Sequence, residues 1–152
     1  MYKKLCTNLE ESRRLASILP IETSDMFWEF QPKKDSGGDD CEEYYPRVEH
    51  YLSYAREKNE WTKPNKDVPS WSLAALLDLL PNEIKTGKIE YSIDIRKSIS
   101  SEGKKLYQVS YGGVIGKKKV WEDYLVTPVC EEFTDVLYMM IVKLHENNIN
   151  IV

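Results

Sequence analysis

Apolar residues recur at steps of three and four near the end of the chain, which predicts one helix over residues 127–147 with one buried face. Thr127 is expected to cap its first turn, and Pro128 follows at a position where a missing N–H costs nothing. Asn147 and Asn148 are expected to end the helix. The repeating apolar positions are Val129, Phe133, Val136, Leu137, Met140, Ile141 and Leu144.

A period of two in the preceding segment predicts β-strands. Apolar and polar residues alternate over 89–96 and again over 106–111, and a weaker alternation covers 120–126. In this third strand the pattern leaves the inward face open between two sets of residues. The first set is Trp121 with Leu125, and the second is Val120, Tyr124 and Val126.

These elements predict an α+β fold: a three-stranded antiparallel meander packed against a long C-terminal helix, with additional N-terminal and central helices. The run Thr7-Asn8-Leu9-Glu10 has the form of a capping box and is expected to begin the N-terminal helix, which ends before Pro20. Ser70 is expected to cap the central helix, which Pro81 ends. We expect a single domain of residues 1–152. The residues expected inside it from the last helix are Phe133, Leu137, Met140 and Ile141.

The composition changes at about residues 31–69, which we interpret as a charged, aromatic-rich insertion. Just before it, residues 23–30 are expected to form a capped turn whose apolar group docks on the core. The acidic first part of the insertion is expected to be mobile, and residues 62–69 to be a connection. Between them, helical spacing behind Pro46 predicts a helix of about three turns. Its apolar positions are Val48, Tyr51, Leu52 and Ala55.

The chain has 152 residues, of which 41% are hydrophobic, enough for one core. Its net charge of −4 is unevenly distributed, since residues 85–119 hold nine Lys or Arg against three Asp or Glu, a local charge of +6. Solvated hairpin tips that oppose edge-to-edge aggregation are one explanation. A polyanion-binding site is the other. Its candidate residues are Lys104, Lys105, Lys117, Lys118 and Lys119.

Metal, cofactor and catalytic sites are not expected. His50 and His145 have no Cys, His or carboxylate at a ligand spacing, and the acidic run over 35–43 lacks the order of a calcium loop. No run approaches the roughly 20 apolar residues of a membrane span, so no membrane partner is expected. Reduced thiols in a cytoplasmic protein are expected, because the cysteines lack C-x-x-C spacing. The cysteines are Cys6, Cys41 and Cys130.

Aromatic rings of the insertion are the candidate partner-binding residues, because Tyr and Trp present a large contact area at low entropic cost. These candidates are Tyr44, Tyr45, Tyr54 and Trp61. Alternatively, aromatic rings of the insertion anchor the predicted helix behind Pro46 on the domain. This explanation fits Tyr51 best, because it lies on the apolar side of that helix. We therefore expect a non-enzymatic accessory or adaptor protein that binds another protein.

The alternative function is nucleic-acid binding through the basic β-hairpin region 85–119. The order of one helix, three strands and one helix is similar to that of double-stranded-RNA-binding domains. Such a domain needs lysines at the start of its last helix to reach phosphates. Here that helix is expected to open with Glu131, Glu132 and Asp135, which would repel phosphates, so nucleic acid is the less favoured partner.

Three stretches of the chain carry a family resemblance: residues 7–15, residues 71–81 and residues 133–138. Through them the chain resembles an uncharacterised family of small proteins encoded in prophages and other mobile elements of gut-dwelling anaerobic bacteria. The shared motifs are structural, so the resemblance implies an origin and carries over no functional residue.

Overall fold

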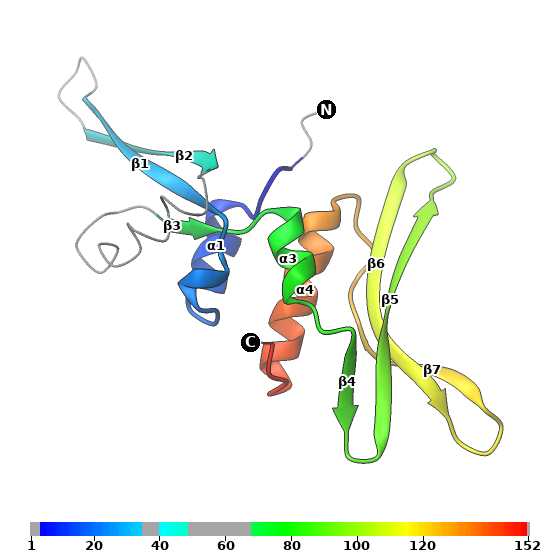
Figure 1. The fold of residues 1–152 in the computed structure, drawn as a ribbon. Helices are drawn as coiled ribbons and strands as arrows, with labels where there is room; N and C mark the ends of the chain where they lie inside the picture. Colours follow the sequence, from blue (N-terminus) through cyan, green and yellow to red (C-terminus); the bar gives the residue numbers. More distant parts are fainter. Residues whose placement is uncertain (1–3, 35–39, 49–67, 152) are drawn as a thin grey trace. The chain divides into compact units, whose positions relative to one another are not determined.

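The computed structural model describes residues 4–34, 40–48 and 68–151, which form an α+β fold as predicted (Figure 1). The chain divides into two compact units. The N-terminal unit comprises residues 5–75, and the C-terminal unit comprises residues 76–152 together with residues 1–4. Each unit has its own antiparallel sheet, so we describe the two separately.

The sheet of the C-terminal unit is a four-stranded antiparallel meander in the order β4-β5-β6-β7. Three of its strands lie in the segments where the alternation predicted strands. The fourth, β4, was not predicted, because four residues with Ile84 as their one buried side chain are too few to show an alternation. The strands are β4 (Glu83–Thr86), β5 (Ile89–Ile99), β6 (Lys105–Ile115) and β7 (Val120–Val126).

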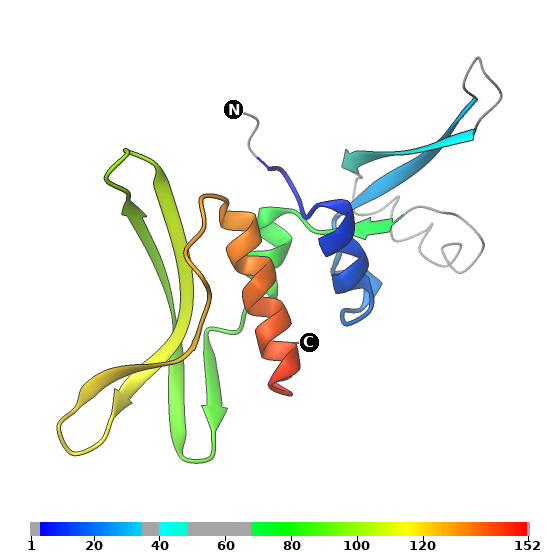
Figure 2. The same ribbon diagram turned by 180° about the vertical axis from the view of Figure 1, so that it is seen from behind.

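One face of this sheet is packed against the C-terminal helix α4 (Phe133–Glu146), which contacts β6 and β7 (Figure 2). Leu137, Met140 and Ile141 are completely buried, as predicted. Phe133 is half-buried, and its ring stacks on that of Tyr107 with 5.0 Å between the ring centroids. The predicted contact between meander and helix is therefore confirmed.

The predicted start of this helix is wrong, because α4 begins six residues after Thr127. Thr127 continues the pairing with β6 instead: its N–H donates to the Val109 carbonyl at 2.9 Å, and its hydroxyl accepts the Val109 N–H at 3.0 Å. Cys130 then exchanges two backbone hydrogen bonds with Tyr107. Since residues 127–130 are extended, Val129 does not join the helical stripe and is 51% exposed.

The N-terminal unit has a three-stranded antiparallel sheet in the order β2-β1-β3. It corrects the interpretation of residues 23–48, since the dense apolar group after Ser24 and the start of the proposed insertion form a β-hairpin. Aromatic residues favour strands, which accounts for strand formation over this part of the chain. The elements of this unit are α1 (Leu9–Ala16), η1 (Ile21–Thr23), β1 (Met26–Lys34), β2 (Asp40–Val48) and β3 (Val68–Ser70). The helix α3 (Leu73–Leu79) begins in this unit and ends in the C-terminal unit.

The helix predicted behind Pro46 is wrong at its start, because Pro46 and Val48 lie in β2 and pair with Trp28 and Met26 of β1. Its other apolar positions, Tyr51, Leu52 and Ala55, lie outside the described residues. Residues 62–67 also lie outside them. The remaining part of the predicted connection, residues 68 and 69, belongs to β3.

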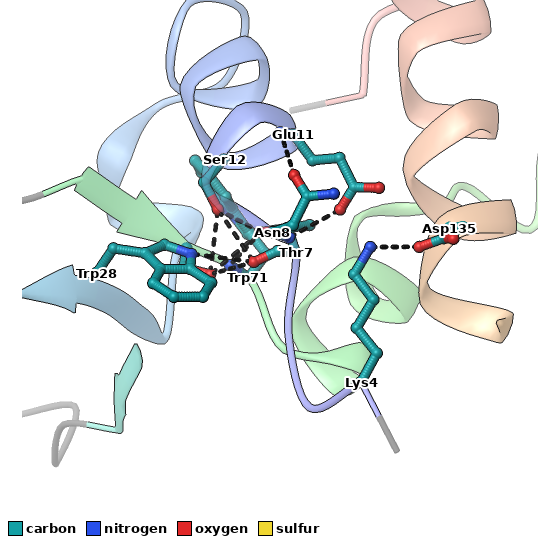
Figure 3. Close-up of polar contacts among 9 residues, drawn as sticks. Lys4, Thr7, Asn8, Glu11, Ser12, Trp28, Trp71 and Asp135 are labelled. Atoms are coloured by element: carbon teal, nitrogen blue, oxygen red, sulfur yellow. Dashed lines mark hydrogen bonds and ion pairs between the residues drawn. The ribbon is translucent and has the colours of Figure 1, made fainter. Parts of the chain in front are cut away.

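The capping box of α1 is real but lies one residue later than predicted. Asn8 is the cap: its side chain accepts the Glu11 N–H at 2.8 Å, and the Glu11 carboxylate accepts the Asn8 N–H at 2.8 Å (Figure 3). Thr7 is buried instead, where its hydroxyl lies 2.7 Å from that of Ser12 and 3.1 Å from that of Ser70. The Trp28 indole N–H donates to the Thr7 carbonyl at 3.0 Å.

This buried hydroxyl cluster also explains why Ser70 does not cap the central helix. Ser70 ends β3 inside the cluster, and Ser72 replaces it at the helix start by accepting the Ala75 N–H at 3.3 Å. Asp25 in turn accepts the backbone N–H of Ser72 at 2.8 Å and also its hydroxyl. The cap therefore depends on a residue 47 positions away, which local sequence reasoning does not detect.

We predict that Leu137→Ala lowers the free energy of unfolding by about 2–5 kcal/mol, because it leaves a cavity at a completely buried position. The measurement is chemical denaturation followed by circular dichroism. Val129→Ala is the matched control, since position 129 belongs to the same predicted stripe but is half exposed, and it should change stability by less than about 0.5 kcal/mol. Equal effects at the two positions would contradict the packing described.

Candidate functional site

The second face of the C-terminal sheet carries the candidate site. Residues paired across neighbouring strands have side chains on the same face of a sheet. Val109 and Tyr111 point to the face that packs on the helix, so the strand register identifies the side chains on the other face. We call this surface the open face, because Val114 is 60% exposed and Trp121 44% exposed. The open face comprises Glu83, Lys85, Glu90, Ser92, Asp94, Arg96, Gln108, Ser110, Gly112, Val114, Trp121, Asp123 and Val126.

A β-bulge in β7 decides which side chains reach the open face. Tyr111 pairs with Leu125 but Gly112 pairs with Asp123, so Tyr124 is an extra residue. Its ring turns to the helix-packed side and stacks on Tyr91, with 4.6 Å between the ring centroids. Neither predicted inward set is therefore correct as a whole.

Of the first predicted set, Leu125 is buried but Trp121 belongs to the open face. Of the second set, Tyr124 reaches the helix-packed side only through the bulge, and Val120 and Val126 are 54% and 39% exposed. A strict alternation cannot produce this distribution, because the bulge changes the phase of the strand between residues 123 and 125.

Four side chains from β5 and β7 form a hydrogen-bonded group across the open face. The Asp123 carboxylate accepts the Trp121 indole N–H at 3.0 Å and two N–H groups of Arg96 at 3.1 and 3.4 Å. The third contact of Arg96 runs from its Nε to Asp94 at 2.6 Å. We call these residues, with Gly112 between them on β6, the Trp121 cluster.

Gly112 provides the space in which the indole lies. A Cβ atom on residue 112 would lie 2.6 Å from the Trp121 Nε1 and 2.7 Å from its Cε2, closer than atoms can approach. The indole ring therefore rests on the backbone of β6, as aromatic side chains do over a glycine in a neighbouring strand. One side of the ring meets Gly112, and the exposed remainder meets solvent.

The charges of the Trp121 cluster stabilise one another. The Trp121 N–H and the Arg96 guanidinium lower the pKa of Asp123, and hydrogen bonds to Asp94 and Asp123 raise the pKa of Arg96. Both groups are therefore charged at neutral pH, far from the pKa that an acid–base catalyst needs. The arrangement holds an aromatic ring and a guanidinium in fixed positions, which suits binding.

The partner-binding candidates of the sequence are only partly placed. Tyr44 and Tyr45 lie on β2, opposite Phe30 and Glu29 of β1. Their side chains, and the whole of Tyr54 and Trp61, lie outside the described residues. Binding through these four aromatic residues stays a prediction.

The polyanion-binding candidates do not form one surface. Lys104 and Lys105 lie where β6 begins, whereas Lys117, Lys118 and Lys119 follow its end (Figure 1). At about 3.3 Å per residue, the two groups are roughly 35–40 Å apart. Lys104 also forms an ion pair with Glu131 at 2.8 Å.

Cys130 is half-buried. Burial and the nearby Asp135 carboxylate raise the pKa of the thiol, which disfavours the thiolate. Asp135 itself forms an ion pair with Lys4, within the C-terminal unit (Figure 3). Cys130 is therefore not part of the candidate site.

The sequence pattern placed Trp121 only among the possible inward-facing residues of the third strand and did not reveal its role in the cluster. The available signal was the Gly112-Gly113 pair inside a strand pattern, which marks a close approach of another group. The glycine pair did not show that Trp121 is the side chain that approaches it. The alignment of Gly112 with β7 depends on the bulge, which the sequence pattern does not reveal.

No protein-family model, curated protein or solved structure matches the chain. The resemblance to proteins of mobile elements therefore stays a prediction. Across residues 4–34, 40–48 and 68–151, no three or more His, Cys, Asp or Glu side chains are placed to hold a metal ion. None of the helices in this part of the chain is long and apolar enough to cross a membrane.

Two neighbouring glycines allow a matched test of the cluster. We predict that Gly112→Ala displaces the Trp121 ring, shifts its indole N–H resonance and speeds its hydrogen exchange. Stability should fall by less than about 1 kcal/mol, because an exposed ring can move away. Gly113→Ala should destabilise more, by about 1–3 kcal/mol, because its Cβ would lie 2.8 Å from the backbone oxygen of Glu90. An unchanged indole resonance in Gly112→Ala would contradict the geometry.

The pH dependence of the cluster follows from Asp123. Its pKa in the folded state lies below the ordinary value for Asp, so the ionised carboxylate stabilises the fold at neutral pH and that contribution is lost as the pH falls through the folded pKa. We predict that the Trp121 indole resonance titrates with a midpoint below that of an ordinary Asp. Asp123→Asn should abolish this titration. A midpoint above the ordinary Asp value would show that the two side chains are not hydrogen-bonded.

Proposed function

We propose that this chain is a non-enzymatic accessory or adaptor protein that binds another protein through the open face. The observation that carries the proposal is Trp121, an exposed indole held in one orientation by Gly112 and Asp123. Large aromatic residues that are exposed and fixed in place are typical of binding surfaces.

The side chains of Trp121 and Arg96 are already ordered before a partner binds. Immobilising a side chain at an interface costs about 0.5–1.5 kcal/mol, and the cluster has fixed Trp121 and Arg96 in advance. Val114 and Val126 add exposed apolar area on the same face. Binding hot spots of protein–protein interfaces are enriched in Trp and Arg, and they lie beside apolar residues with polar groups around them. The open face has this composition.

Nucleic-acid binding through the basic region 85–119 remains the alternative, supported by Lys117, Lys118 and Lys119 at the β6–β7 turn. Two of the other basic groups in the region have carboxylate partners: Lys85 pairs with Glu90 at 3.6 Å, and Arg96 pairs with two aspartates. These pairs weaken the attraction for phosphates. Protein binding needs no unpaired cation and is therefore preferred.

Site-specific photocrosslinking in cells that express the protein tests the proposal. A photoreactive phenylalanine analogue at position 114 lies on the open face, whereas the same analogue at position 120 belongs to the other face of the meander. We expect position 114 to give a discrete crosslinked protein that disappears when Trp121→Ala is added, while circular dichroism shows an intact fold.

Equal crosslinking from positions 114 and 120 would show that the open face is not the binding surface. Crosslinks to nucleic acid that are lost on replacing Lys117, Lys118 and Lys119 would establish the alternative function instead.

A further inference from the structure

We propose that the partner presents an extended segment with two cationic side chains at positions i and i+4, which lies across the strands of the open face. This inference rests on the proposed function and specifies the partner chemistry of the same site. It follows from the charge of the face, from one row of residues across the sheet and from the position of Trp121.

The open face is acidic although the surrounding sequence is basic. It holds the carboxylates of Glu83, Glu90, Asp94 and Asp123 against the cations of Lys85 and Arg96, a net charge of −2. Both cations already have carboxylate partners on the same face. An anionic partner would thus meet an excess of carboxylates, whereas a cationic partner is attracted.

Two of these carboxylates are crowded together. The neighbouring Glu90 carboxylate raises the pKa of Glu83, and the proximity of Glu83 lowers the pKa of Glu90. Like charges this close disfavour full ionisation. A cation from a partner would relieve the crowding and bring the pKa of Glu83 down.

The strand register arranges four residues in one row across the sheet. Glu83 pairs with Ser92, Ser92 with Gly112, and Gly112 with Asp123. The row thus has a carboxylate at each end and small residues in its middle. Three interstrand spacings of about 4.8 Å place its ends roughly 14 Å apart.

An extended peptide matches this length. Its side chains at i and i+4 point to the same side and lie about 13 Å apart, and the residue at i+2 lies between them. Two cationic residues would then meet Glu83 and Asp123, while the residue between them passes over Ser92 and beside the Trp121 indole that covers Gly112. Shape and charge therefore specify the same segment.

Trp121 provides a further contact beside the Asp123 end of this row. The exposed side of the indole can receive a cation, an interaction that Trp provides best among the aromatic residues. The Ser110 hydroxyl is completely buried and helps to lower the pKa of Asp123, which keeps the carboxylate at this end of the row ionised.

The test is an NMR titration of the full chain that follows the Trp121 indole N–H. The probe is acetyl-Lys-Val-Ala-Val-Lys-amide, and its controls are an isomer with the two lysines at i and i+2 and an analogue with Glu in place of Lys. We expect the i, i+4 peptide to bind most tightly, the Glu analogue not to shift the resonance, and affinity to fall with salt.

Charge-matched variants locate the contact. Glu83→Gln should weaken the i, i+4 peptide about fivefold, as the loss of one exposed charge pair implies. Glu122→Gln removes the same charge from the opposite side of β7 and should leave the affinity unchanged. In the wild type, the titration of Glu83 should move to lower pH when the peptide is bound.

Several results would overturn the proposal. These are a preference for the Glu analogue, equal binding of the two lysine isomers, or no effect of Glu83→Gln. A Trp121 resonance that moves on dilution without peptide would also overturn it, because a second copy would then occupy the face. If crosslinking from position 114 still captures a protein, the proposed function stands and only this partner chemistry fails.

Discussion

Packing of α4 on the meander is the interaction on which the C-terminal unit depends. Completely buried residues of the helix, among them Leu137 and Met140, and of the sheet, Val109 and Tyr111, lie on the two sides of this contact. One helix can cover only one face of a four-stranded sheet. The other face must therefore be compatible with water or be covered by a partner, and its exposed Trp121 and Val114 favour a partner.

The bulge at Tyr124 connects this packing to the candidate site. It keeps Leu125 and Tyr124 on the helix-packed side and leaves Trp121 and Asp123 on the open face. Gly112 then admits the indole against the backbone of β6. One irregularity in one strand thus serves both the core and the surface.

Periodic patterns predicted the elements of the C-terminal unit well, because period two and period 3.6 follow from burial of one face. The predictions were poor for polar residues that can form a hydrogen bond either within a local helix cap or with a residue distant in the sequence. Thr7, Ser70 and Thr127 all have the chemistry of a helix cap, but each is buried and uses its hydroxyl elsewhere. The candidate site depends likewise on contacts between β5 and β7, which are distant in sequence, so the alternation of residues could not reveal it.

Solvent accessibility of the open face in the isolated chain is the measurement that tests the account most directly. Relaxation by a soluble paramagnetic gadolinium chelate should broaden the Val114 methyl and Trp121 indole signals strongly, and should leave the Val109 methyl signals sharp. This result would show that one face of the sheet is covered and the other is available to a partner. Protection of Val114 and Trp121 at all protein concentrations would contradict the account, because the open face would then be covered within the chain itself.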